Sequence, residues 1–153
     1  MGMAMASQRM VAILSESADA QGILQHTRDT RDRFGVPFIE RLVESRAVVR
    51  DTVAAFEAAE AAVFVVANTS ADPLSAAVAS ATARPVLAVP LEAEGLGALE
   101  SLRATARGGP PVATLAIGKA GATNAGLLAV AILATSRSDM RLAGAERLIA
   151  AST

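Results

Sequence analysis

Short apolar runs alternate along the chain with segments whose apolar residues recur at helical spacing. Runs that are rich in β-branched residues and free of polar alternation predict buried strands, and a spacing of three or four residues predicts helices. Apolar strands separated by helices are typical of a parallel sheet that is covered on both faces, so the pattern predicts a doubly wound, three-layer α/β/α fold. The predicted strands are 10–14, 38–43, 62–67, 85–89 and 112–117, and the predicted helices are 18–34, 48–60, 73–82, 95–106, 122–135 and 137–150.

Ligands of such sheets bind beyond the carboxyl ends of the strands, near the point where the strand order reverses. The segments that follow the predicted strands are therefore the places where a site is expected. They are residues 15–19, 44–48, 68–73, 90–95 and 118–124.

Length and composition fit one domain. The chain has 153 residues, of which 52% are apolar, enough for one full core. Residues 1–8 are expected to be a disordered segment, and residues 9–153 form the single domain. No signal peptide and no apolar run of bilayer length are found, which predicts a cytoplasmic protein without membrane contacts.

Several classes of site are excluded by what the chain lacks. It has no cysteine, which excludes disulfides, thiolate catalysis and cysteine-bound metals. It has one histidine, His26, so no metal site is predicted. No cofactor is predicted either. The net charge is −1 and no basic block is present, which argues against a nucleic-acid partner.

The predicted helix 122–135 carries apolar residues around nearly its whole circumference. A helix of this kind is buried on all sides. In a domain of this size the second buried side is expected to face another subunit, so the helix predicts a homo-oligomer. The alternative is a central helix inside a monomer.

A glycine-rich segment, Gly118-Lys119-Ala120-Gly121, partly resembles a phosphate-binding loop. The Walker pattern needs a glycine where Ala113 stands, and Ser or Thr after the lysine, where this chain has Ala120. The glycines are therefore interpreted as a tight turn from strand to helix with a close backbone approach.

Residues 111–134 read PVATLAIGKAGATNAGLLAVAILA, and this segment resembles the C-terminal signature of the PurE family. That family contains N5-carboxyaminoimidazole ribonucleotide mutases and aminoimidazole ribonucleotide carboxylases. The PVLAVP of residues 85–90 and Val36-Pro37 also match, and the resemblance covers residues 9–135. It implies a flavodoxin-like fold, a homo-octamer with active sites between subunits, and lyase or isomerase chemistry on the imidazole ring of a ribonucleotide.

The first loop of the family resembles Gly-Ser-x-Ser-Asp and holds the phosphate and ribose. Here Asp19 matches, but Glu16 and Ala18 stand where the two serines are expected. Ser15 and Ser17 offer hydroxyls one position away, and Glu16 would repel a phosphate. Ser17 or Asp19 can alternatively cap the following helix, and for Ser17 both interpretations stay open.

The second family loop, Ser-Ala-His-Arg-Thr-Pro, corresponds to residues 44–49. A gapless alignment places Arg46 at the histidine and Ala47 at the arginine, whereas a shift of one residue retains Arg46 as an anion-binding arginine. A solvent-facing loop arginine is the alternative. Ser45 is the neighbouring candidate for ligand binding.

The third family loop, Gly-Ala-Gly-x-Ala-Ala-His-Leu-Pro-Gly, corresponds to residues 67–75. Its glycines are absent here, and Pro73 stands at the histidine. Asn68, Thr69 and Ser70 follow a predicted strand and are candidates for a rebuilt ligand site. The alternative is that Thr69, Ser70 or Asp72 caps the helix that begins near Pro73.

His26 lies within a predicted helix and is expected at the surface, so the usual histidine acid–base group is missing. Glu16, Glu44 and Asp72 are the carboxylates that can substitute for it. The sequence predicts a divergent PurE-like enzyme that carboxylates, decarboxylates or rearranges a small nitrogen heterocycle or nucleotide-like ligand. A non-catalytic binding or scaffold subunit is the alternative. The candidate ligand-binding residues are Ser15, Ser17, Asp19, Ser45, Arg46, Asn68 and Ser70; no catalytic residue is assigned.

Overall fold

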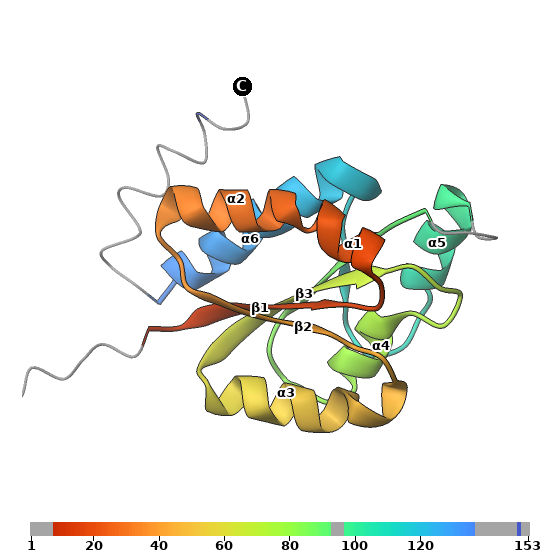
Figure 1. Ribbon diagram of the computed structural model, residues 1–153, viewed down its shortest axis with the longest axis horizontal. Helices are drawn as coiled ribbons and strands as arrows, with labels where there is room; N and C mark the ends of the chain where they lie inside the picture. Colours follow the sequence, from red (N-terminus) through yellow and green to blue (C-terminus); the bar gives the residue numbers. More distant parts are fainter. Residues whose placement is uncertain (1–7, 93–96, 137–149, 151–153) are drawn as a thin grey trace, which may run out of the picture.

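The computed structural model describes residues 8–92, 97–136 and 150, and in them a parallel sheet lies between two layers of helices (Figure 1). Its order is β2-β1-β3-β4-β5, and every neighbouring pair is parallel. This order belongs to the flavodoxin-like doubly wound sheet, so the predicted fold class is confirmed, and the order reverses between β1 and β3. The strands are β1 (Met10–Ser15), β2 (Phe38–Leu42), β3 (Ala61–Asn68), β4 (Val86–Pro90) and β5 (Ala113–Thr114).

Helices cover both faces of the sheet (Figure 1). The first face carries α1 (Ala18–Ile23), α2 (Gln25–Phe34) and α6 (Gly118–Ala134). The second carries α3 (Val49–Ala58), entered through the 3-10 turn η1 (Arg46–Val48), and α4 (Leu74–Ala79). The last helix, α5 (Ala98–Thr105), packs against β4.

Side-chain alternation along the strands divides the core into two clusters. In β3, Val65 points to the cluster shared with α6, whereas Phe64 and Val66 point to the cluster shared with α3 and α4. All three side chains are fully buried. Each contributes roughly 1.5–3 kcal/mol by burial, and β3 is paired on both edges, with β1 and with β4.

The predicted helix 18–34 is divided in two. Leu24 ends α1 with its side chain buried in the core, and α2 begins at Gln25. Gly22 is a poor helix former and weakens the preceding turn. The Gln21 carbonyl at the break accepts a hydrogen bond from Arg28 Nη2 at 2.8 Å, which satisfies a backbone group that a continuous helix would use internally.

The turn between β5 and α6 also differs from the prediction. The strand predicted at 112–117 pairs only over Ala113–Thr114, at the edge of the sheet, where short strands are usual. The helix starts at Gly118, which has a φ of 70°, and the whole segment 118–124 is helix rather than loop. A Cβ on Gly121 would lie 1.7 Å from the Ala116 carbonyl oxygen, which confirms the predicted close approach.

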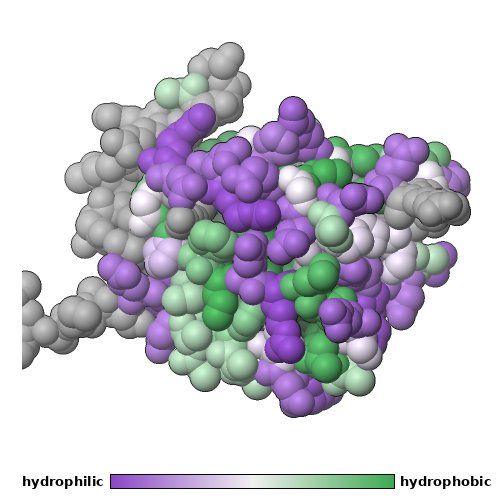
Figure 2. All heavy atoms as spheres, viewed as in Figure 1, coloured by the Kyte–Doolittle hydropathy of each residue, from purple (hydrophilic) through white to green (hydrophobic). Residues whose placement is uncertain are grey.

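One side of α6 is not covered by the described residues. Leu128 is 38% exposed, although Ala125, Ala129 and Leu133 on the inner side are buried. Within the described part of the chain the helix is therefore not enclosed on all sides, and burial against a second subunit stays a prediction. The neighbouring helix α2 is hydrophilic on its outward side, as Figure 2 shows.

Two predicted segments lie almost wholly outside the described residues. These are the disordered segment 1–8, of which only Gln8 is described, and the helix 137–150, of which only Ala150 is described. None of the helices within the described ranges has the length and apolar character that a bilayer crossing requires.

Candidate functional site

Four loops meet at the carboxyl edge of the sheet, where the strand order reverses. They follow β1, β2, β3 and β4, and every residue that the sequence put forward as a ligand contact lies in them or at their borders with the neighbouring strands and helices. A cavity of about 290 Å³ opens between the loops after β1, β3 and β4. Its lining consists of Ser17, Asp19, Ala20, Ile23, Thr69, Leu91 and Glu92.

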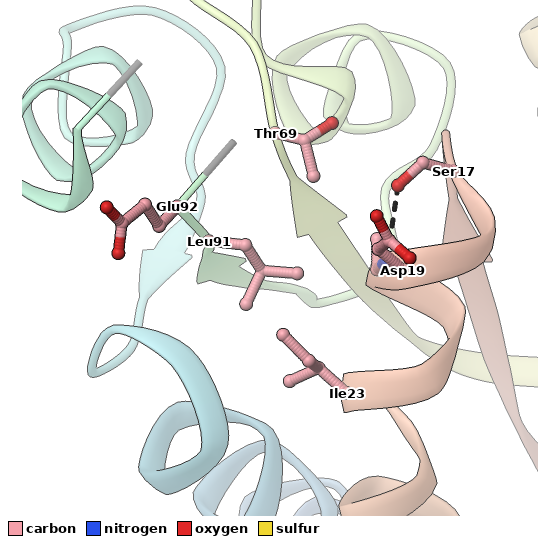
Figure 3. Close-up of a pocket in the computed structure, with 7 residues that line it drawn as sticks. Ser17, Asp19, Ile23, Thr69, Leu91 and Glu92 are labelled. Carbon is pink, nitrogen blue, oxygen red and sulfur yellow. Dashed lines mark hydrogen bonds between the residues drawn. The ribbon is translucent and has the colours of Figure 1, made fainter. Parts of the chain in front are cut away.

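The cavity has a polar side and an apolar side (Figure 3). Ser17, Asp19 and Thr69 lie together on one side, while Ile23 and Leu91 point toward each other across the other side. The Glu92 carboxylate points away from this group. Asp19 is therefore the ionisable group on the polar side, and its carboxylate makes no hydrogen bond or ion pair with the described residues. An apolar wall opposite a few polar groups is typical of sites for small organic ligands.

Ser17 has the capping role that was one of its two interpretations. It is the N-cap of α1, and its Oγ accepts a hydrogen bond from the Ala20 backbone N at 3.1 Å. The same side chain lines the cavity, so capping does not remove it from contact with a ligand. Asp19 lies exposed in the first turn of α1 and is not the cap.

Arg46 is not a free loop arginine. Its guanidinium forms an ion pair with the Glu16 carboxylate, and its Nη2 donates to the Asp72 carbonyl oxygen at 2.6 Å. The Asp72 carboxylate lies 3.8 Å from Nε, too far for a hydrogen bond, and Nε makes none although it is shielded from solvent. Arg46 thus joins the loops that follow β1, β2 and β3.

Two hydroxyl groups from the loop after β3 approach the same carboxylate. Thr69 Oγ1 donates to Glu16 Oε2 at 3.1 Å. Ser70 Oγ lies 3.4 Å from this oxygen and 2.7 Å from the Asp72 carbonyl oxygen, so its single proton goes to the shorter contact. The Glu16 side chain is 15% exposed, and its charge is balanced by Arg46.

Asn68 points into the protein. Its Nδ2 donates to Ser75 Oγ at 2.7 Å and to Thr105 Oγ1 at 3.0 Å, and its Oδ1 accepts from the Ser75 backbone N at 3.0 Å. The carboxamide therefore binds the start of α4 and the end of α5 to the strand end. Capping of α4 by Thr69, Ser70 or Asp72 was a wrong alternative, because Asn68 supplies the acceptor.

The two remaining candidates lie at the strand ends as predicted but outside the cavity lining. Ser15 is buried at the end of β1, where its carbonyl accepts from Val43. Ser45 is exposed and caps η1, its Oγ accepting from the Ala47 backbone N at 3.2 Å. The third carboxylate considered as a histidine substitute, Glu44, is exposed beside it.

His26 lies on α2, in a different place. It lines a second cavity of about 200 Å³ with Asp29, Thr30, Arg33, Thr123 and Leu127, between α2 and α6. No histidine lines the cavity at the strand ends. Within the described part of the chain, no group of three or more His, Cys, Asp or Glu residues is arranged to hold a metal ion.

Four residues that complete the cavity were overlooked by sequence reasoning: Ala20, Ile23, Leu91 and Glu92. The sequence could have indicated two of them, because Leu91 and Glu92 directly follow β4 and lie in the strand-end segment 90–95. Ile23 carried no such signal, since an apolar residue at the end of a short helix is expected in the core.

Comparison with known proteins places these observations in a family. The model of the AIR carboxylase family matches residues 10–148. The N5-carboxyaminoimidazole ribonucleotide mutase of Bacillus subtilis is 35% identical over 141 residues, covering 87% of this chain and 85% of the relative. The Pseudomonas aeruginosa protein of the same name is 36% identical over 132 residues, covering 81% and 79%.

Solved structures agree on the fold. The crystal structure of a single-residue variant of Treponema denticola PurE2 superposes with a TM-score of 0.81 at 16% identity, covering 95% of this chain and 92% of the other. Treponema denticola PurE gives a TM-score of 0.80 at 17% identity, covering 94% and 92%. The described chain therefore has the fold of these two PurE structures.

Proposed function

The chain belongs to the AIR carboxylase family, the PurE family, and on that basis we propose that it carboxylates, decarboxylates or rearranges a carboxylate on a small nitrogen heterocycle or nucleotide-like compound. The cavity at the carboxyl edge of the sheet is the proposed site. Its position at the reversal of strand order is where doubly wound sheets bind ligands. Its volume of about 290 Å³ suits a compound of a few rings at most.

Asp19 is the residue that carries the proposal. It lies on the polar side of the cavity beside Ser17 and Thr69, and it has no partner among the described residues. A carboxylate in this position accepts hydrogen bonds from ring nitrogens, amino groups or hydroxyls. When a ring carbon loses a carboxylate as CO₂ it takes up a proton, and Asp19 is the ionisable group of the polar side that can hold this proton.

The proposed reaction is not the ordinary mutase reaction of the relatives. That reaction, as the resemblance implies, uses histidines beside the ring, and the cavity of this chain has none. A positioned acid–base group contributes a factor of about 10² to 10⁴ in rate. Arg46 does not substitute for a histidine, because a guanidinium stays protonated and it is already paired with Glu16.

The test is an absorbance assay with carboxylated aminoimidazole ribonucleotides, their ribosides and their free bases. The Bacillus subtilis relative is assayed in parallel. We expect ribonucleotide interconversion to be slower than in the relative by a factor of at least about 10², together with binding or turnover of at least one compound that Asp19→Asn weakens.

Two results would contradict the proposal. Ribonucleotide turnover that equals the relative's and survives His26→Ala would mean that the mutase reaction proceeds without the missing histidines. Failure of every aminoimidazole compound to bind, measured by thermal shift, would point to the non-catalytic scaffold subunit.

A further inference from the structure

The carboxylate of Glu16 is bound as an anionic ligand would be. It receives the Arg46 guanidinium in an ion pair and the Thr69 hydroxyl in a hydrogen bond, and Ser70 Oγ lies 3.4 Å away. These donors come from the loops after β2 and β3 and converge on one point. Such a set, an arginine with adjacent hydroxyls at strand ends, is suited to a phosphate or carboxylate group.

We infer that Glu16 fills an anion-binding site from within the chain, and that the compound bound in the neighbouring cavity therefore carries no phosphate. Thr69 connects the two places, because it lines the cavity and also donates to Glu16. The part that concerns the bound compound rests on the proposed function. The part that concerns Glu16 does not.

Charge supports the same conclusion. A phosphate that reached Arg46 would have to share the guanidinium with Glu16, with the exposed carboxylate of Asp72 3.8 Å from Nε. In the neighbouring cavity, which Thr69 also lines, Asp19 adds a further negative charge. Like charges a few ångströms apart repel strongly at the edge of a protein, where the effective dielectric is about 20. An unphosphorylated heterocycle or nucleoside meets no such repulsion, and its amino and hydroxyl groups suit Asp19.

Removal of Glu16 should free the donors. In Glu16→Ser the Arg46 Nη2 keeps its hydrogen bond to the Asp72 carbonyl, while its N–H toward Glu16 and the Thr69 hydroxyl become available to an anion. Inorganic phosphate is the probe, and its binding is measured by calorimetry and by the rise in Tm with phosphate concentration. We expect Glu16→Ser to bind phosphate more tightly than the wild type by on the order of 100-fold.

Two variants control the experiment. Glu44→Ser makes the same change of net charge at an exposed glutamate near the site, and it should leave phosphate binding as weak as in the wild type. The double variant Glu16→Ser, Arg46→Ala should lose the gain. If Glu16→Ser unfolds in phosphate-free buffer, recovery of folded protein on addition of phosphate is the expected result.

The outcomes separate the two parts of the inference. Phosphate binding by Glu16→Ser no tighter than by Glu44→Ser, or failure of phosphate to restore folding, overturns the anion site. The second arm compares the affinities for the aminoimidazole riboside and its ribonucleotide. The wild type should bind the riboside more tightly, and Glu16→Ser should bind the ribonucleotide more tightly. A wild type that binds the ribonucleotide more tightly overturns the part about the compound. If the wild type binds neither compound, the proposed function fails, while the inorganic phosphate arm still decides the role of Glu16.

Discussion

Asn68 should act as a stabilising residue of the fold, and Asn68→Ala should lower the free energy of unfolding by about 3 kcal/mol. The side chain is 0% exposed and makes hydrogen bonds to Ser75 Oγ, Thr105 Oγ1 and the Ser75 backbone N. A buried hydrogen bond contributes about 0.5–1.5 kcal/mol, and a partner left unsatisfied costs about 1–3 kcal/mol. Three lost contacts, partly relaxed, give the stated magnitude.

Asn68→Asp should be at least as destabilising, although it preserves the size of the side chain. A carboxylate still accepts from the Ser75 N–H, but it cannot donate to either hydroxyl. Thr105 Oγ1 already donates to the Ser101 carbonyl at 2.8 Å and would have to give up that bond to serve the carboxylate. A charge would also be buried without a cation beside it, which costs more than the lost hydrogen bonds.

Urea unfolding at fixed protein concentration measures the effect, because the stability of an assembly depends on concentration. With a slope of about 2 kcal/mol per molar urea, Asn68→Ala should lower the midpoint by about 1.5 M. Arg50→Ala, at an exposed position of α3 away from the predicted subunit interface, is the control and should stay within about 0.5 kcal/mol of the wild type. An unchanged midpoint for Asn68→Ala together with weakened ligand binding would mean that Asn68 faces the ligand.

Two further predictions concern the site and the assembly. Asp19→Asn should weaken ligand binding about 10-fold or more, but it should change the free energy of unfolding by less than about 0.5 kcal/mol, because the exposed Asp19 is not the cap of α1. The control Asp51→Asn, at an exposed acid in the first turn of α3, should change neither quantity. Unchanged affinity in Asp19→Asn refutes the site role. Light scattering is expected to detect a homo-octamer, and Leu128→Glu should lower the fraction of protein in it. Leu99→Glu, at a 51% exposed residue of α5, should leave that fraction unchanged. A wild-type mass near the 15.5 kDa of one chain refutes the assembly.

The fold could be predicted because its strands are apolar on both faces. An uninterrupted run such as Val63–Val66 fits a buried parallel strand and few other structures. The break at Leu24 could not be predicted in the same way, because Leu24 also fits the apolar stripe of a continuous helix. The length of β5 depends on its single neighbour β4, which no local pattern reveals.

The position of the candidate site could be predicted from the sequence, but the directions in which its side chains point could not. All seven candidates lie at or next to strand ends, since chain topology alone brings these ends to one edge. Asn68 and Thr69 are adjacent in sequence, yet one side chain enters the core and the other lines the cavity. Side chains that alternate at the end of a strand point to opposite sides, and which side holds the cavity depends on the helices that cover it.

The pairing of Glu16 with Arg46 changes what each residue implies. Taken separately, Arg46 suggests a site for an anion and Glu16 argues against one. Together they neutralise each other between two separate loops, in a place where the Glu16 side chain is 15% exposed and that of Arg46 is 34% exposed. A carboxylate so shielded is costly without a cation, so Arg46 stabilises a chain with Glu16 at this place whether or not the chain binds phosphate. The presence of the arginine is therefore no evidence for a phosphorylated substrate in this member of the family, and Asp19, which has no such partner among the described residues, is the better guide to what the site binds.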